Sequence, residues 1–319
     1  MKALAVAAAL VFALIGSACA RVETEEAGGV DLSGSTIRVV ATVGMIADAV
    51  ERVGGDRVEV EALMGPGIDP HVYKASEGDV QLLVDADLVF FNGLHLEAKL
   101  ADVLERLEGR AVAVAEAIPP GRRLEPPGFG GNYDPHVWFD VRLWGLVVER
   151  VRDVLAERDP ANAAGYRERA GRYLTEMREL DEWIRGQVER VPRVQRVLVT
   201  AHDAFNYFGR AYGFDVRGLQ GISTASEAGA GDIQTLAAFI AERQIRAMFV
   251  ESSVSPRAVE AVQEAVRARG FDVRIGEPLF SDAMGDRGTP EGTYLGMVRF
   301  NTDTIVGALS AADTATPAA

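Results

Sequence analysis

Short strand patterns alternate with helical patterns along almost the whole chain, and this alternation limits the folds that the sequence can adopt. Stretches rich in β-branched or apolar residues lie at residues 36–43, 58–64, 88–91 and 111–115 in the first half, and at 196–200, 247–250 and 273–275 in the second. A helical pattern separates most of these stretches from the next. Such alternation is typical of parallel sheets with helices packed against them. The sequence therefore predicts an α/β protein with one parallel sheet in each half.

The longest helical pattern lies between the two halves. Residues 161–191 contain few helix breakers, and Pro192 follows them. A helix of about 30 residues is roughly 45 Å long. We expect this helix to run along or between two lobes.

The first twenty residues have the pattern of an export signal. Lys2 supplies a positive charge, and residues 3–15 are almost wholly apolar. That apolar stretch is too short for a membrane-spanning helix, which needs about 20 residues. Small residues then precede Cys19, which is the only cysteine, so the chain has no internal disulfide.

Two interpretations of Cys19 compete. It is either the lipidated first residue of a mature lipoprotein or part of an ordinary cleavage site after Ala20. Lipid anchoring is favoured, because small residues precede Cys19 and the polar stretch at 21–35 fits a tether. The bulky aliphatic residue usual three positions before such a cysteine is absent, since Gly16 stands there.

The length and net charge of the chain limit the classes of function that it can have. The chain has 319 residues, enough for two domains of ordinary size. Its formal net charge of −14 argues against binding nucleic acid or anionic lipid through bulk charge, and it suits a cationic ligand.

The chain contains four histidines, and two of them stand in the same tripeptide, at Asp69-Pro70-His71 and Asp134-Pro135-His136. Neutral imidazole is the commonest metal ligand, and a preceding proline restricts the backbone that presents it. The candidate histidines lie more than sixty residues apart, so no zinc-finger or HExxH spacing exists. A single loop histidine is more often structural. The repetition, together with His202 after a predicted strand, favours a metal site.

Asp282 is the carboxylate that best completes such a site. In parallel α/β sheets ligands bind at the carboxyl ends of strands, and His71, His202, Glu251 and Asp282 all lie at or after predicted strand ends. Three imidazoles and one carboxylate make a four-coordinate site for a zinc-like ion. The alternative interpretation is that Asp282 only shapes a turn or caps a helix. Glu251 has three possible roles: a metal ligand, a partner that orients a ligand, or a purely structural residue. The second and third roles are preferred.

The aspartates beside the histidines have two interpretations. Asp69, Asp134 and Asp203 flank the candidate histidines. Each either orients an imidazole, as carboxylates commonly do at metal sites, or caps a turn.

Several motifs follow one another in the order found in a known family. They are GPGIDPH at 65–71, NGLHLE at 92–97, DPHVW at 134–138, TAHDAFNYF at 200–208, GLQGIS at 218–223, FVES at 249–252, FSD at 280–282 and GTY at 292–294. With these motifs the chain resembles the cluster A-I substrate-binding lipoproteins of ABC transporters, which capture Zn²⁺, Mn²⁺ or Fe²⁺. The resemblance covers roughly residues 36 to 309.

The resemblance implies two α/β lobes, each a parallel sheet flanked by helices, joined by one long rigid helix, with the metal ion between the lobes. The expected divisions are a signal peptide at 1–20, a tether at 21–35, an N-terminal metal-binding lobe at 36–157, a linking helix at 158–191, a C-terminal metal-binding lobe at 192–309 and a disordered tail at 310–319.

The resemblance also implies the ligands. His71 and His136 match the family's two ligands from the N-terminal lobe, and His202 and Asp282 match the two from the C-terminal lobe. Manganese-type members usually carry Glu at the position of His202. Zinc-type members carry a histidine-rich loop between the first two ligands, whereas the stretch before Asp134 here is rich in Gly and Pro and holds no histidine. The chain therefore falls between the two types.

Coordination chemistry ranks zinc first. Three nitrogens and one oxygen suit Zn²⁺, which outranks Mn²⁺ in intrinsic affinity, although a bidentate Asp282 would admit Mn²⁺. His95 is not a family ligand and is expected to be structural or near the site.

The function that the resemblance implies is an exported binding protein, not an enzyme, that delivers a divalent cation to a membrane permease. It is expected to be periplasmic or on the cell surface, monomeric, and without a nucleic-acid partner. Two alternatives remain open. One is a metal-dependent hydrolase with Glu251 as the base, although the chain has no HExxH or GxSxG motif. The other is a surface adhesin with a structural metal.

Overall fold

The structure is a computed structural model that describes residues 30–127 and 129–310. The predicted export signal with Cys19, residues 21–29 of the predicted tether and the predicted tail after Ser310 lie outside the described residues. In the described part, no helix combines the length and the apolar character needed to cross a membrane.

The N-terminal half contains a four-stranded sheet in the order β2-β1-β3-β4. Its strands are β1 (Ile37–Ala41), β2 (Val58–Ala62), β3 (Leu88–Phe91) and β4 (Ala111–Ala113), all paired in parallel. The inner strand β3 is almost wholly buried. Burial on both faces explains why its sequence is a continuous apolar run rather than an alternating one.

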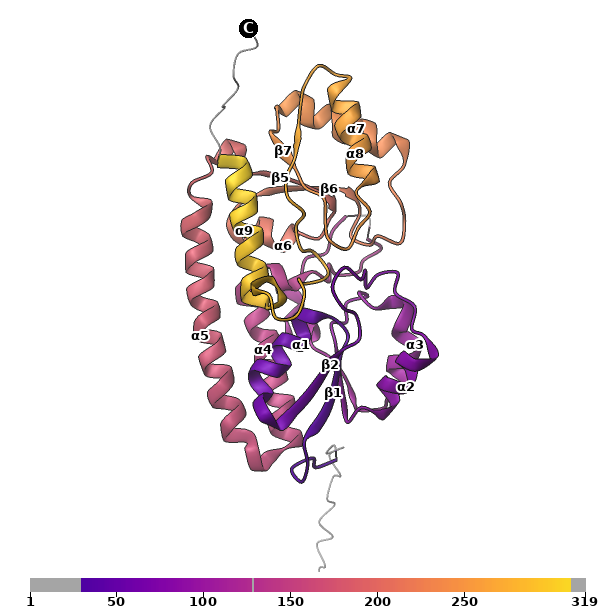
Figure 1. The fold of residues 1–319 in the computed structure, drawn as a ribbon, viewed down its shortest axis with the longest axis vertical. Coiled ribbons are helices and arrows are strands. Elements are labelled where there is room, and N and C mark those ends of the chain that lie inside the picture. Colours follow the sequence, from indigo (N-terminus) through magenta and orange to yellow (C-terminus); the bar gives the residue numbers. More distant parts are fainter. Residues whose placement is uncertain (1–29, 128, 311–319) are drawn as a thin grey trace, which may run out of the picture.

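Helices cover both faces of this sheet. They are α1 (Gly44–Gly54), α2 (Glu77–Asp85), α3 (Ala101–Glu105) and α4 (Val141–Arg158). Figure 1 shows α1 and α4 on one side of the sheet and α2 and α3 on the other. Ser76 caps α2, since Ser76 and Asp79 form a capping box.

The predicted long helix is α5 (Ala163–Val188), preceded by a 3-10 turn at Pro160–Asn162. Its 26 residues span about 39 Å. The buried residues recur every three or four positions, as one apolar face requires; they include Tyr166, Ala170, Tyr173, Met177, Leu180 and Ile184. Figure 1 shows α5 running along both halves, with the closing helix α9 (Tyr294–Ser310) beside it.

The C-terminal half contains two parallel strand pairs, β5 (Val197–His202) with β6 (Asp215–Gln220) and β7 (Ala247–Met248) with β8 (Arg274–Ile275). Phe249 N donates to Val199 O at 2.9 Å and joins the two pairs. The flanking helices are α6 (Asn206–Tyr212), α7 (Ala230–Arg243) and α8 (Arg257–Arg267). The α/β fold with two lobes and one long helix is therefore confirmed.

One hydrophobic core extends from the N-terminal sheet through α5 and α9 to α6, and a second fills the space among β5, β7, α7 and α8. The first core crosses between the lobes. Phe139 stacks on Phe205 with ring centroids 4.2 Å apart, and Tyr294 OH donates to Trp138 O at 2.8 Å. The loops that carry the candidate site residues are therefore attached to a continuous packed frame.

The last residues of the predicted tether contact the folded body. Leu32 N donates to Arg158 O at 2.6 Å, and the Arg57 guanidinium donates to Ser35 O at 2.7 Å. The chain therefore contacts the folded body before residue 36, which was predicted as the first residue of the N-terminal lobe.

Asp159 links the α4–α5 turn to the N-terminal lobe. Its buried carboxylate accepts hydrogen bonds from Arg57 Nε at 3.1 Å, Asn162 Nδ2 at 2.8 Å and Tyr166 OH at 2.5 Å. Burial alone would raise the pKa of Asp159, but these hydrogen bonds outweigh it and lower the pKa to about 2. As pH falls below about 4, the unfolded chain takes up this proton first, so the contribution of Asp159 to stability is lost between about pH 4 and pH 2.

We expect Asp159→Asn to lower the free energy of unfolding at pH 7 by about 2 kcal/mol, because charge-assisted bonds are lost. The variant should also lose less stability than the wild type between pH 4 and pH 2. Urea denaturation at several pH values measures both effects, with Asp153→Asn as the control on the exposed face of α4. Equal losses in the two variants would contradict the account.

Candidate metal centre

Four of the predicted site residues meet in one buried cluster. His71, His136, His202 and Asp282 each offer a ligand atom, and these atoms all lie within 4.8 Å of one another. Each of the four residues is at most 3% exposed. His71 lies in the loop between β2 and α2, His136 just before α4, His202 at the end of β5 and Asp282 between β8 and α9. Both lobes therefore contribute two residues.

The spacing of these atoms fits one ion at the centre. His136 Nε2 lies 3.3 Å from the Nε2 atoms of His71 and His202. Asp282 Oδ1 lies 3.3 Å from His136 Nε2, and Oδ2 lies 3.2 Å from His202 Nε2 and 3.7 Å from His71 Nε2. Atoms bound to zinc at about 2.0–2.1 Å in a tetrahedron lie about 3.3–3.4 Å apart. Four of the five distances are within about 0.2 Å of that spacing.

The repeated Asp-Pro-His tripeptide is a repeated turn. Asp69 Oδ1 accepts a hydrogen bond from the backbone N of His71, and Asp134 Oδ1 accepts one from the backbone N of His136, both at 2.9 Å. Aspartate commonly bonds to the backbone two residues ahead and so fixes a turn. In both loops the aspartate therefore shapes the backbone that presents the histidine.

Two of the imidazole rings are also held by carboxylates. His136 Nδ1 lies 2.7 Å from Asp134 Oδ1, and His202 Nδ1 lies 2.5 Å from Glu251 Oε2. Glu251 Oε1 also accepts the backbone N of His202 at 2.9 Å. A carboxylate at Nδ1 favours the tautomer with its proton there, which leaves the Nε2 lone pair free for the centre. Asp203 instead accepts a hydrogen bond from Gly218 N at 2.8 Å.

Carboxylates around the cluster favour positive charge on two of its three imidazoles. Burial lowers the pKa of His71 to about 3. Burial also opposes the charged form of His136, but Asp134 and Asp282 outweigh it and raise its pKa to about 9. In His202 burial is likewise outweighed, by Glu251 and Asp282, and the pKa lies well above its usual range. The same carboxylates would stabilise a divalent cation.

Asp282 is fully buried without the hydrogen bonds that a carboxylate needs. Both Oδ1 and Oδ2 are inaccessible to solvent, and neither has a hydrogen-bond partner among the described residues. In the metal-free protein only the imidazoles at 3.2–3.7 Å can offset the charge of this buried carboxylate, whose burial costs several kcal/mol. A cation bound among the three Nε2 atoms would meet both oxygens and remove this cost. The cluster therefore fits a metal ion.

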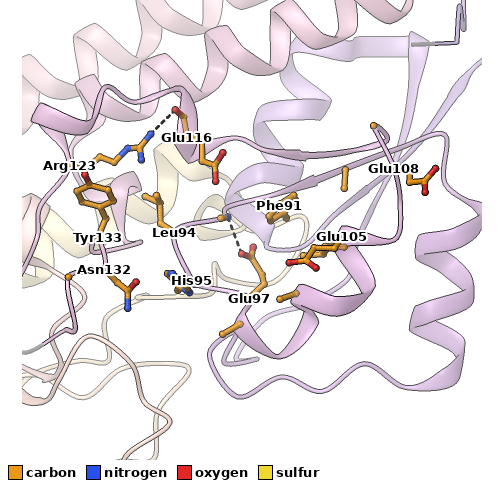
Figure 2. Close-up of a pocket in the computed structure, with 17 residues that line it drawn as sticks. Phe91, Leu94, His95, Glu97, Glu105, Glu108, Glu116, Arg123, Asn132 and Tyr133 are labelled. Carbon is orange, nitrogen blue, oxygen red and sulfur yellow. Dashed lines mark hydrogen bonds between the residues drawn. The ribbon is translucent and has the colours of Figure 1, made fainter. Parts of the chain in front are cut away.

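His95 lies outside the cluster. It is exposed, follows β3 and has a positive φ of 67°. It lines a cavity of about 640 Å³ beside α3, which Figure 2 shows with Glu105, Arg123 and Tyr133 around it. Of the described residues that line this cavity, none belongs to the four-residue cluster. His95 therefore serves as an internal comparison for the three clustered histidines.

We expect Glu251→Gln to weaken metal binding about 10–100-fold, the range typical of partners that orient metal ligands. The amide oxygen can still accept the backbone N of His202, but the amide NH₂ would face Nδ1 and favour the wrong tautomer. Titration against a competing chelator measures the affinity. Glu260→Gln, on the exposed face of α8, is the matched control. An affinity within twofold of the wild type would exclude this role for Glu251.

Comparison with known proteins adds independent information. The family model described as "Zinc-uptake complex component A periplasmic" matches residues 39–308. The zinc-binding protein TroA of Treponema pallidum is 53% identical over 274 residues, covering 85% of this chain and 88% of TroA. The manganese-binding lipoprotein MntA of Bacillus subtilis is 48% identical over 287 residues, covering 88% of this chain and 94% of MntA.

Solved structures show the same similarity. The structure of the periplasmic zinc-binding protein TroA from Treponema pallidum has a TM-score of 0.84 at 52% identity, covering 86% of this chain and 99% of that one. The structure of Fe(III)-bound YtgA from Chlamydia trachomatis has a TM-score of 0.77 at 29% identity, covering 86% of this chain and 98% of that one.

Proposed function

Since the chain belongs to the family of periplasmic zinc-uptake complex components, we propose that His71, His136, His202 and Asp282 bind the ion that it carries. The protein is the extracytoplasmic metal-binding component of an ABC transporter, which captures Zn²⁺ or Mn²⁺ and passes it to a membrane permease. The ion is thus cargo. The matching family is one of transport proteins and not of enzymes, and neither the hydrolase nor the adhesin alternative has support.

One observation carries the assignment of the ligands. The two buried oxygens of Asp282, which lack hydrogen-bond partners among the described residues, face three Nε2 atoms, two of them at the spacing of a tetrahedral site and His71 Nε2 at 3.7 Å. A purely structural aspartate at this place would be expected to accept hydrogen bonds. The arrangement supports binding of a cation by all four residues together.

Zinc is the favoured cargo in this proposal. The two relatives above are named for zinc and for manganese, so similarity alone does not decide between them. Three imidazole nitrogens with one carboxylate suit Zn²⁺, which stands above Mn²⁺ in intrinsic affinity. Both oxygens of Asp282 border the centre, so bidentate binding would raise the coordination number and admit Mn²⁺.

We expect one Zn²⁺ per chain, bound at least about tenfold more tightly than Mn²⁺. Titration of the metal-free protein with each ion under a competing chelator measures both the stoichiometry and the affinities. Each ion should also raise the melting temperature, because it binds only the folded state, and at equal concentration the more tightly bound ion should raise it further. Tighter binding of Mn²⁺ would overturn the choice of cargo, and the absence of stoichiometric binding would overturn the site.

The proposal also covers the domain boundaries, the oligomeric state and the membrane anchor of the protein. The lobes span residues 36–157 and 192–309 around a linking segment at 158–191. The protein acts as a monomer without catalytic activity and is anchored through a lipid on Cys19. The net charge of −14 supports the absence of a nucleic-acid partner. Cys19→Ala should move the protein from the membrane fraction to the soluble fraction, and an unchanged distribution would exclude the anchor.

A further inference from the structure

One pair of side chains ties the loop that carries His71 to the opposite lobe. The hydroxyl of Thr224 donates a hydrogen bond to Asp69 Oδ2 at 2.5 Å. Asp69 lies in the loop between β2 and α2, whereas the half-buried Thr224 lies in the loop between β6 and α7. The bond therefore joins the two lobes beside the metal centre.

Asp69 connects this bond directly to a proposed ligand. Its Oδ1 accepts the backbone N of His71 at 2.9 Å, while its Oδ2 accepts the hydroxyl of Thr224. Pro70, between Asp69 and His71, has a fixed φ and removes one degree of freedom from this short path. A change in the position of Asp69 is therefore passed on to the backbone of His71.

His71 depends on this loop more than the other two histidines depend on theirs. The rings of His136 and His202 are each held at Nδ1 by a carboxylate. Within residues 30–127 and 129–310, no hydrogen bond to His71 Nδ1 occurs. His71 Nε2 also lies 3.7 Å from Asp282 Oδ2, compared with 3.2 Å for His202 Nε2. The ring of His71 is therefore placed by its backbone turn rather than by a partner of its own.

We propose that Thr224 is a positioning residue that acts through Asp69 to keep His71 on the bound ion, and that release of the ion begins when this bond breaks. The inference rests on the proposed function, because it takes His71 as a ligand. Loss of a hydrogen bond to a charged group at a half-exposed position should raise the dissociation rate about tenfold. The association rate should change little, because interactions made only in the final complex act mainly on dissociation.

The test compares the rate of zinc release among variants. Protein loaded with Zn²⁺ is mixed with excess chelator in a stopped-flow instrument. We expect Thr224→Val to release zinc about tenfold faster than the wild type and Thr224→Ser, which keeps the hydroxyl, to release it at nearly the wild-type rate. Thr235→Val is the matched control, since Thr235 is an exposed residue of α7 whose hydroxyl bonds within its own helix.

A double-mutant cycle tests the route through Asp69. If Thr224 acts through Asp69, then Asp69→Ala combined with Thr224→Val should release zinc no faster than Asp69→Ala alone. Multiplicative effects of the two substitutions would overturn the inference. Release of zinc from Thr224→Val at the wild-type rate would also overturn it, as would equally fast release from Thr224→Val and Thr224→Ser. If Thr224→Val lowers the melting temperature of the metal-free protein, the release rate of Thr224→Ser still tests whether the hydroxyl is needed.

The variant His71→Ala distinguishes an error in the proposed ligand set from an error in the role of Thr224. If it leaves zinc affinity unchanged, the proposed ligand set is wrong and the inference falls with it. If His71→Ala weakens binding at least about 100-fold while Thr224→Val releases zinc at the wild-type rate, the ligand set stands and only the role of Thr224 is overturned.

Discussion

Replacing Asp282 by alanine is expected to weaken Zn²⁺ binding by at least about 100-fold, equivalent to about 2.7 kcal/mol. Residues that merely orient metal ligands contribute 10–100-fold, and Asp282 is the only proposed ligand that carries a negative charge. In the metal-free protein the substitution also removes the carboxylate that faces His136 Nε2 and His202 Nε2 at 3.3 and 3.2 Å. A chelator-competition titration measures the loss, and circular dichroism checks that the metal-free fold is retained.

The matched control is His95→Ala, which removes an exposed histidine of the N-terminal lobe from outside the cluster. Its zinc affinity should remain within twofold of the wild type. His202→Ala should also weaken binding strongly, but it leaves the buried Glu251 carboxylate without its imidazole and so affects folding as well. Zinc affinity near the wild-type value in Asp282→Ala would remove Asp282 from the ligand set.

Replacing Trp138 by alanine is expected to have the largest effect on stability, a loss of about 3–5 kcal/mol in the free energy of unfolding. The ring is fully buried and packs edge-on against His136 and Trp144, with centroids 5.3 and 6.5 Å away. Its Nε1 donates to Ser281 O at 3.0 Å, next to Asp282. The side chain therefore joins a ligand loop of each lobe, and its removal leaves a cavity between them.

Trp138→Phe separates packing from hydrogen bonding. Phenylalanine keeps most of the apolar volume and loses the bond to Ser281 O, so the expected loss is about 1–2 kcal/mol. Urea denaturation of the metal-free proteins measures both variants. If Trp138→Ala lowers the free energy of unfolding no more than Trp138→Phe does, packing of Trp138 between the lobes is not its main contribution to stability. The account of the shared core would then be wrong.

The fold was largely predictable because its strands are short apolar runs separated by well-marked breaks. The inner strand β3 matches its predicted bounds, residues 88–91. Strand β6 was missed, since Asp215, Arg217 and Gly218 interrupt its apolar residues and only Leu219 of the strand is buried. A Cβ at Gly218 would lie 2.5 Å from Asp203 N, so the tight contact requires glycine in a strand where glycine is usually rare.

The helical pattern between the strand stretches at 88–91 and 111–115 forms only a short helix. It consists of a 3-10 turn at Ala98–Leu100 followed by α3 (Ala101–Glu105). Apolar spacing alone does not distinguish one helical turn from three, because the tight return to β4 at Ala111 ends the helix early.

The four residues of the buried cluster could be named from the sequence, but their arrangement could not. Resemblance to a family supplied the four candidate ligands, and the repeated tripeptide is explained by two equivalent turns. The bond between Asp69 and Thr224 joins residues 155 positions apart, and no local pattern marks it. Likewise, the sequence offered two roles for Asp203, and only the fold places it against Gly218.

The most direct test of the central claim is the position of the bound ion. A crystal structure of the zinc-loaded protein, with anomalous data at the zinc edge, should show one ion about 2.0–2.2 Å from the Nε2 atoms of His71, His136 and His202 and from a carboxylate oxygen of Asp282. No water should complete the coordination, since four protein ligands close the site. An ion bound elsewhere, or one that leaves any of these four residues out, would contradict the account.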